Sequence, residues 1–519
     1  MYVSLFFLLF DNVAFFSGLF KVYPLEDNSA FLFSIAIIVF SFTVFIFTLL
    51  SSRWTLKPLL IVVVLISALT NYFMNTYHIV VDASMIRNTL QTDLHESMDL
   101  LSIKELLYLI LLGILPAFII YKIPLQKRPF KKVLESKVKT LILSLVLIAI
   151  SLFSFNKYYT SFFREHKPLR YTVNPLYWIY STGKYISLTY NSAPLVLKPM
   201  GIDAKVVADG AVPKLVIMVV GEAARADHFS LNGYARETNP KLKMEEVINF
   251  PNMYSCGTST AVSVPCMFSL LSRDAYSYKK GRAQENVIDV LKHTKKVALL
   301  WRDNNSDSKG VALRIPYENY KISQNNQICS EGECRDIGML KGLDSFIRKH
   351  QDKDILIVLH QMGNHGPAYY KRYTKAYEKF TPVCNTNQLE SCIKEEITNA
   401  YDNAILYTDT FLSKVIAFLK TYDKSHRTAM IYMADHGESL GENGLYLHGL
   451  PYFMAPDAQK HIGALMWFGT QMKRSIDITH LQSIASKKFS QDNLAYTLLG
   501  LFNVQTKVYQ PKMDILHAK

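Results

Sequence analysis

The feature that most constrains this chain is a series of long apolar runs confined to its first third. They cover residues 3–20, 30–50, 58–76, 106–121 and 138–155, and Asp11 and Asn12 interrupt the first of them. Each run approaches the roughly 20 residues that an α-helix needs to cross the hydrocarbon core of a bilayer. We therefore expect a transmembrane domain of five helices over residues 1–157.

The charges of the loops indicate how these helices are oriented. Loop 122–139 carries seven Lys and Arg residues against one Glu, and the loop after the second run carries Arg53 and Lys57. Loops 21–29 and 77–104 contain more acidic than basic residues. Because basic loops stay in the cytoplasm, five spans would place everything after residue 155 on the outer side. For a bacterial inner membrane, that side is the periplasm.

The cysteines and the net charge agree with this topology. The six cysteines all follow the apolar third and form three sequence-local pairs without CxxC spacing, which favours disulfides over a zinc ribbon or scattered free thiols. The net charge of +14 suits either a nucleic acid or an anionic membrane as partner. Since no basic stripe with interleaved aromatic residues is present, we expect a membrane and no nucleic acid.

Two further regions follow the apolar runs. Residues 158–212 are rich in aromatic and basic residues and then in Pro and Gly, so they are expected to form an interfacial connector and linker. From residue 213 to 519, runs of strand length alternate with amphipathic helical segments. This alternation predicts an α/β catalytic domain in which helices pack on a mainly parallel sheet.

Four expected strands of this domain end in polar residues. The strands cover 214–220, 297–301, 355–359 and 429–434. Ligands of open α/β sheets bind at the carboxyl ends of the strands, so these ends predict one site. Glu222, Asp435 and His436 offer oxygen and imidazole donors that suit zinc, and manganese nearly as well.

Other residues in the same loops are weaker candidates. His365 and His448 each stand beside a glycine and could bind a second metal or the substrate phosphate. Asn305 and Lys309 could contact a phosphate, although an ordinary surface loop explains them as well.

A cluster of hydroxyl groups precedes an expected helix over 261–271. Thr258, Ser259 and Thr260 stand where unpaired backbone N–H groups and the positive end of the helix dipole favour a phosphoryl group. Metal coordination would make such a hydroxyl a better nucleophile, whereas the alternative is a simple helix cap. Spacing alone leaves the choice among the three residues open.

A third group lies in the outer loop between the third and fourth spans. Asn88, Thr92 and Glu96 are spaced i, i+4, i+8, so on a helix they share one face. This face could hold a lipid head group or could be a solvated surface.

Together these motifs resemble those of the lipid A phosphoethanolamine transferases, and most of all the mobile colistin-resistance group. The segments are GEAARADH at 221–228, CGTSTA at 256–261 with PC at 265–266, HQMGNHGP at 360–367 and DHGESLGE at 435–442. One departure is Ala223, where members usually carry Thr. The resemblance covers nearly the whole chain and implies an alkaline-phosphatase/sulfatase-like catalytic fold.

The resemblance also assigns roles to residues. It implies a zinc site of Glu222, Thr260, Asp435 and His436 with Thr260 as nucleophile. It places His365 and His448 at a second metal or substrate-phosphate position with Asn305 and Lys309 nearby, and it assigns Asn88, Thr92 and Glu96 to the lipid donor. The implied disulfides are Cys256–Cys266, Cys329–Cys334 and Cys384–Cys392.

The expected reaction follows from the resemblance. A monomeric, multi-pass inner-membrane enzyme would move phosphoethanolamine from phosphatidylethanolamine to a lipid A phosphate, conferring resistance to polymyxins and other cationic peptides. The alternatives are transfer of phosphoethanolamine to a core sugar, transfer of phosphoglycerol, or a membrane-anchored phosphatase.

Overall fold

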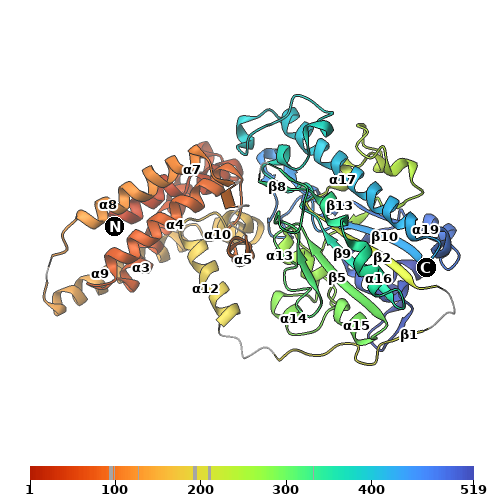
Figure 1. Ribbon diagram of the computed structural model, residues 1–519. Helices are drawn as coiled ribbons and strands as arrows, with labels where there is room; N and C mark the ends of the chain where they lie inside the picture. The colour runs from red at the N-terminus through yellow and green to blue at the C-terminus, as the bar shows by residue number, and fades with distance from the viewer. Residues whose placement is uncertain are drawn as a thin grey trace. The chain divides into compact units, whose positions relative to one another are not determined.

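The computed structural model describes residues 1–92, 97–98, 100–126, 128–190, 196–207, 212–330 and 332–518 (Figure 1). It divides into two compact units. The first, a helical unit, comprises residues 1–86 and 101–190, and the second, a catalytic unit, comprises residues 87–100 and 191–519. Each unit is described by itself below.

Four helical segments of the first unit are long and apolar enough to cross a membrane, judged over the residues described. They are α3 (Leu25–Leu50), α4 (Leu56–Thr76), the continuous segment Ile103–Lys122 and α9 (Phe130–Ser154). These four correspond to the second to fifth predicted runs. The first run instead forms two helical segments, Tyr2–Asp11 and Val13–Val22, which are bent by 59° and give a fifth span only if they count as one.

The bend lies at the two polar residues that interrupt the first run. Asp11 and Asn12 are buried, and the Asn12 amide donates to Phe7 O at 2.9 Å and to Asn174 O at 2.6 Å. Asn71 of α4 donates to Asp11 Oδ1 at 2.9 Å. Backbone groups released by a break in an apolar environment need partners within the protein, and these amides supply them.

The predicted connector is helical in its first half. Helices α10 (Asn156–Glu165), α11 (Lys167–Arg170) and α12 (Leu176–Tyr190) belong to the helical unit. The second half joins the catalytic unit, where strand β1 (Lys205–Val206) pairs antiparallel with β16 (Val504–Gln505).

The catalytic unit is built on a seven-stranded sheet with the order β3-β14-β10-β2-β9-β5-β6. Its strands are β3 (Ile248–Asn249), β14 (Ala464–Phe468), β10 (Arg427–Ala434), β2 (Lys214–Gly221), β9 (Asp354–His360), β5 (Val297–Asp303) and β6 (Tyr317–Asn319). The five strands from β10 to β6 are parallel to one another, and at one edge β14 pairs antiparallel with both β10 and β3. The mainly parallel sheet predicted from the sequence is confirmed.

Helices cover this sheet, as the long central strands require. All eight residues of β2 and all eight of β10 are buried, which is typical of parallel strands with both faces covered. Helix α17 (Lys394–Tyr422) packs against β2 and β10, and α15 (Val287–His293) packs against β5. Figure 1 shows β2, β5, β9 and β10 side by side among these helices. The carboxyl ends of four neighbouring parallel strands therefore lie along one edge.

Candidate active site

The ends of β2 and β10 bring three predicted ligands together. Gly221 and Ala434 are paired in register, so Glu222 and the Asp435-His436 pair leave the sheet side by side. His436 Nε2 lies 3.3 Å from Glu222 Oε1 and 3.3 Å from Asp435 Oδ2. One ligand atom from each of the three residues lies within 4.8 Å of the others, and all three side chains are fully buried.

The hydroxyl of Thr260 points at this group. Thr260 is the first residue of α13 (Thr260–Met267), and its Oγ1 donates to Glu222 Oε2 at 3.1 Å and lies 3.4 Å from His436 Nε2. Thr258 Oγ1 instead donates to Leu450 O at 2.6 Å. The geometry thus distinguishes two hydroxyls that spacing could not, and it is Thr260 that contacts the candidate ligands.

The imidazole of His436 is arranged as a metal ligand. Its Nδ1 lies 2.8 Å from the carbonyl oxygen of Gly437, which can only accept, so Nδ1 carries the proton and Nε2 keeps its lone pair. Burial lowers the pKa of His436 to about 4, so the ring is neutral over the physiological range. A neutral imidazole nitrogen that faces two carboxylates is the form in which histidine binds a metal.

The surrounding groups fit a divalent cation. Asp435 Oδ1 accepts from Ala223 N at 3.1 Å and from His436 N at 2.7 Å, whereas Oδ2 is buried and has no hydrogen-bond donor within the described part of the chain. A buried carboxylate oxygen without a donor is costly unless a cation compensates it. Two carboxylates, one imidazole and a hydroxyl form a donor set that zinc accepts.

Asn305 acts on the ligand Glu222. Its Nδ2 donates to Glu222 Oε2 at 2.8 Å and to Gln361 O at 2.7 Å, while its Oδ1 accepts from Ser306 N at 2.6 Å. Asn305 is buried. Its amide therefore orients the carboxylate that also receives the Thr260 hydroxyl.

Lys309, the other predicted residue of this loop, does not reach the ligands. Its Nζ donates to Ser306 O at 3.3 Å and to Gln91 O at 3.4 Å. The ammonium group therefore interacts with backbone carbonyls of its own loop and of segment 87–100.

A buried pair of residues, Asp303 and His360, supports the loop of Asn305 and was not among the site residues predicted from the sequence. Strands β5 and β9 extend to Asp303 and His360, which are paired in register. Asp303 Oδ2 accepts from Trp301 Nε1 at 2.7 Å and lies 2.9 Å from His360 Nδ1, and Oδ1 accepts from Asn305 N at 2.9 Å. Burial raises the pKa of Asp303, but His360 and Trp301 outweigh it and lower the pKa below its usual value. A charged Asp303 thus fixes the start of the Asn305 loop.

The two other predicted histidines lie next to the ligand group. The rings of His448 and His436 are 4.2 Å apart, and those of His448 and His365 are 5.8 Å apart. Glu438 Oε1 lies 3.1 Å from His448 Nδ1. Glu438 was not among the site residues predicted from the sequence. Burial raises the pKa of Glu438 to about 8. The only sequence signal for Glu438 was its place in the DHGE segment.

The loop that carries these residues is held by Arg225. Its guanidinium makes two bonds to Asp227, at 2.9 and 2.6 Å, and donates to Glu442 Oε1 at 2.5 Å and to Glu438 O at 3.1 Å. The side chain is only 6% exposed. The bidentate pair with the more exposed Asp227 fixes the orientation of the guanidinium, and its bonds to Glu438 O and Glu442 tie the segment after β2 to the segment after β10.

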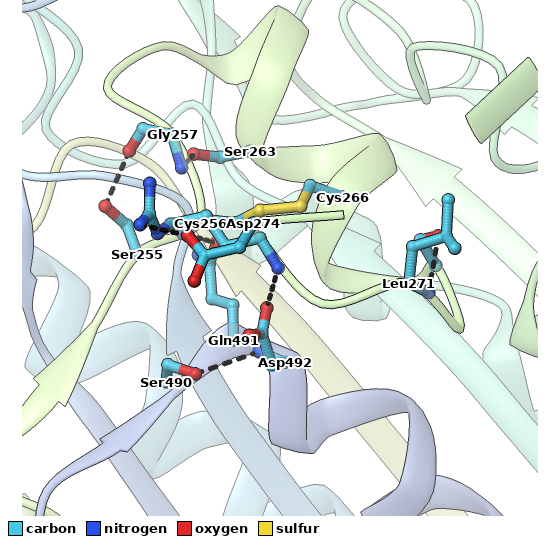
Figure 2. Close-up of a disulfide and its surroundings, with 12 residues drawn as sticks. Ser255, Cys256, Gly257, Ser263, Cys266, Leu271, Asp274, Ser490, Gln491 and Asp492 are labelled. Carbon is cyan, nitrogen blue, oxygen red and sulfur yellow. Dashed lines mark hydrogen bonds and ion pairs between the residues drawn. A yellow bond between two sulfur atoms is a disulfide. The ribbon is translucent and has the colours of Figure 1, made fainter. Parts of the chain in front are cut away.

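The three predicted disulfides are present. They join Cys256–Cys266, Cys329–Cys334 and Cys384–Cys392. The first closes the loop of residues 256–266, which contains Thr260. Figure 2 shows the bond between Cys256 and Cys266. Because its two sulfurs are bonded to each other, the nearby group of Cys256, Cys266 and Asp492 is no metal site.

The predicted lipid-donor face is only partly described. Helix α5 (Ala83–Gln91) contains Asn88 and ends before Thr92, whose hydroxyl donates to Asn88 O at 2.8 Å. Glu96 lies outside the described residues. The helix thus ends before the second residue of the face, and its assignment to the donor stays a prediction.

Known proteins match both units. The family described as Sulfatase matches residues 214–504, and the family described as Phosphoethanolamine transferase EptA/EptB matches residues 39–190. Phosphatidylethanolamine transferase Mcr-1 of Escherichia coli is 45% identical over 515 residues, which cover 97% of this chain and 94% of that protein. Kdo(2)-lipid A phosphoethanolamine 7''-transferase of Salmonella typhimurium is 27% identical over 483 residues, covering 86% and 81%.

A solved structure matches the chain over its whole length. It is the integral membrane protein lipooligosaccharide phosphoethanolamine transferase A (EptA) from Neisseria meningitidis, with a TM-score of 0.95 and 34% identity. The match covers 100% of this chain and 97% of that one.

Proposed function

The chain belongs to the EptA and Mcr family of phosphoethanolamine transferases, and we propose that it moves phosphoethanolamine from phosphatidylethanolamine to a phosphate group of lipid A. The names of its relatives mention phosphatidylethanolamine, lipid A and lipooligosaccharide. The single observation that carries the proposal is the Thr260 hydroxyl, which lies against Glu222 and His436 at the start of a helix.

Thr260 is the proposed nucleophile of a two-step transfer. In the first step its oxygen bonds to the phosphorus of the donor, the bond from phosphorus to the diacylglycerol oxygen breaks, and diacylglycerol leaves with a proton. In the second step an oxygen of the acceptor phosphate attacks the same phosphorus, the bond to Thr260 breaks, and the Thr260 oxygen regains a proton from the acceptor phosphate. Glu222 Oε2 already accepts the hydroxyl hydrogen of Thr260, so in the first step it is placed to take this proton and to pass it to the departing diacylglycerol oxygen.

The cofactor is proposed to be zinc, held by Glu222, Asp435 and His436 together with Thr260. When bound, the metal would make the hydroxyl a better nucleophile and neutralise charge that develops on the phosphoryl oxygens. Thr260 is the first residue of α13, so the positive end of the helix dipole would favour the same oxygens. His365, His448 and Glu438 form the neighbouring cluster in which a second metal or the acceptor phosphate would bind.

The setting of this chemistry is proposed to be the periplasmic face of the inner membrane. The apolar helices and the basic loops support that orientation, and three disulfides suit an oxidising compartment. An added amine and a masked phosphate would reduce the negative charge of lipid A, which would weaken binding of polymyxins and other cationic peptides.

The test compares three variants by mass spectrometry of lipid A from cells that express them. T260A should abolish addition of phosphoethanolamine, whereas T260S, which keeps a hydroxyl, should retain some. T258A is the matched control, because that hydroxyl donates to Leu450 O instead of a ligand. Unchanged modification by T260A would refute the assignment of the nucleophile.

A second measurement identifies the donor. The purified enzyme is given phosphatidylethanolamine and phosphatidylglycerol side by side, each with a labelled acyl chain. Repeated release of labelled diacylglycerol from phosphatidylethanolamine should depend on added lipid A, whereas the release in the first turnover should not. Preference for phosphatidylglycerol would favour phosphoglycerol transfer, and repeated release that is independent of lipid A would favour a phosphatase.

A further inference from the structure

One buried side chain joins the segment that leads to Thr260 to the strand end that carries Asp435. Gln491 begins the short helix η12 (Gln491–Asn493), directly after strand β15 (Phe489–Ser490). Its Oε1 accepts from Cys256 N at 2.6 Å, and its Nε2 donates to Ala434 O at 2.8 Å and to Asp435 O at 2.7 Å. The side chain is fully buried, and Figure 2 shows it beside Cys256.

Each partner of Gln491 belongs to one half of the candidate active site. Cys256 opens the segment that reaches Thr260, and its disulfide to Cys266 ties that segment to the body of α13. Ala434 ends β10, and Asp435 is a candidate metal ligand. The amide therefore connects the backbone of the nucleophile segment with the backbone of the ligand segment.

Only glutamine can make this set of bonds. The three backbone partners require a side chain that accepts one hydrogen bond and donates two, which a primary amide can do. Glutamate of the same length would face two carbonyl oxygens with no hydrogen to donate, and methionine would leave all three backbone groups without a partner. Asparagine has the right groups but is one methylene shorter, so it cannot reach both segments.

The backbone of Gln491 is itself held firmly. Strand β15 pairs in parallel with β4 (Met253–Tyr254), the strand that runs into the nucleophile segment. Ser490 and Asn493 form a capping box around the turn, in which Asn493 Oδ1 accepts from Ser490 N at 3.1 Å. The amide is therefore a rigid link and not an adaptable surface contact.

We propose that Gln491 is a positioning residue for the transfer, which sets the place of Thr260 relative to Asp435 and His436. This inference rests on the proposed function, because it assumes that Thr260 and the ligands act together. Because the Gln491 side chain is fully buried, it does not contact the lipid. Its loss should therefore slow the chemical step and leave donor binding nearly unchanged. A displacement of about 1 Å between reacting groups can lower a rate by roughly 100-fold.

The test uses the full-length enzyme in detergent with acyl-labelled phosphatidylethanolamine as donor. Q491M, Q491E and Q491N are compared with N403A, which removes a fully buried side-chain amide of α17. Asn403 also makes three bonds to backbone groups, accepting from Lys379 N at 3.0 Å and Phe380 N at 2.9 Å and donating to Phe380 O at 2.9 Å. The measurements are kcat, KM, the rate of the first turnover and the thermal midpoint. We expect a fall in kcat of about 10- to 100-fold for the three Gln491 variants, with KM within about twofold.

The control separates positioning from a general loss of stability. N403A should lower the thermal midpoint about as much as Q491N and keep kcat within about twofold of the wild type, measured well below both midpoints. The inference is overturned if Q491N and N403A lose kcat equally at equal stability, or if Q491E, which keeps only the Cys256 bond, equals the wild type. Activity that survives in T260A would instead refute the proposed nucleophile, so the two failures are distinguishable.

Discussion

Replacement of Asn305 by alanine is expected to weaken metal binding, because its amide donates to the proposed ligand Glu222. In the wild type, Nδ2 donates to Glu222 Oε2 at 2.8 Å, and that oxygen also receives the Thr260 hydroxyl at 3.1 Å. Without the amide, the Glu222 carboxylate loses one of the donors that fix its orientation. N305A should therefore lower the affinity for zinc and also kcat.

The magnitude follows from the type of hydrogen bond that is lost. A hydrogen bond to an ionised group contributes roughly 1.5–3 kcal/mol, and about 1.4 kcal/mol corresponds to a factor of ten. If the whole contribution is expressed in binding, N305A should weaken zinc affinity by roughly 10- to 150-fold. Loss of a partner that orients a metal ligand typically costs about 10- to 100-fold, which agrees with this range.

The assay measures zinc affinity by competition with a chromophoric chelator, and kcat and KM with acyl-labelled phosphatidylethanolamine. N326A serves as the matched control, because Asn326 is also fully buried and makes two bonds to backbone groups, Arg335 O and Ile328 N, both at 3.0 Å. N326A should lose stability without losing zinc. If N305A raised KM for the donor while zinc affinity and kcat stayed unchanged, Asn305 would be a phosphate contact and the reasoning would be wrong.

Two further predictions concern stability. Replacing Cys256 and Cys266 by serine should lower the unfolding free energy by about 3 kcal/mol through loop entropy and should also lower kcat. The same change at Cys384 and Cys392 should lower the unfolding free energy nearly as much and leave kcat unchanged. Thermal midpoints and rates measure both effects, and an equal loss of kcat in the two variants would contradict this prediction. Burial raises the pKa of Asp409 to about 6, so the folded state binds the proton more tightly than the unfolded state and gains stability as the pH falls. From pH 8 to pH 5 the unfolding free energy of the wild type should rise by about 1.4 kcal/mol relative to that of D409N. Unfolding free energies of the two proteins that change in parallel with pH would refute this prediction.

The convergence of the ligands could be predicted because it depends on a general property of parallel sheets. Glu222, Asp435 and His436 each follow a strand directly, and neighbouring parallel strands end at the same edge. The candidate set was therefore accessible from apolar runs and the residues after them. The same reasoning could not choose among Thr258, Ser259 and Thr260, because the directions of their hydroxyls depend on the backbone angles at the start of α13.

What the sequence did not reveal are contacts between distant segments. The bond from Gln491 to Cys256 spans 235 positions, and Asp303 meets His360 only through the register of β5 with β9. The polar break in the first apolar run was visible, but its bend depends on Asn174, which lies 162 residues away. The ammonium group of Lys309 interacts with two backbone carbonyls, which the sequence did not indicate, and its contact with a phosphate stays a prediction.

The strand order has a consequence for how the enzyme is made. Strand β2 lies between β9 and β10, so the first strand of the central sheet finds its partners only after residues 354–360 and 427–434 have been synthesised. Such pairings have high contact order and form slowly, because a long loop must close before any bond compensates for its lost entropy. No ribosome-bound fragment that stops before Asp435 can assemble the ligand set. Strand β2 of the emerging chain therefore stays without either neighbour until β9 has been made, and its second neighbour, β10, follows only after α17.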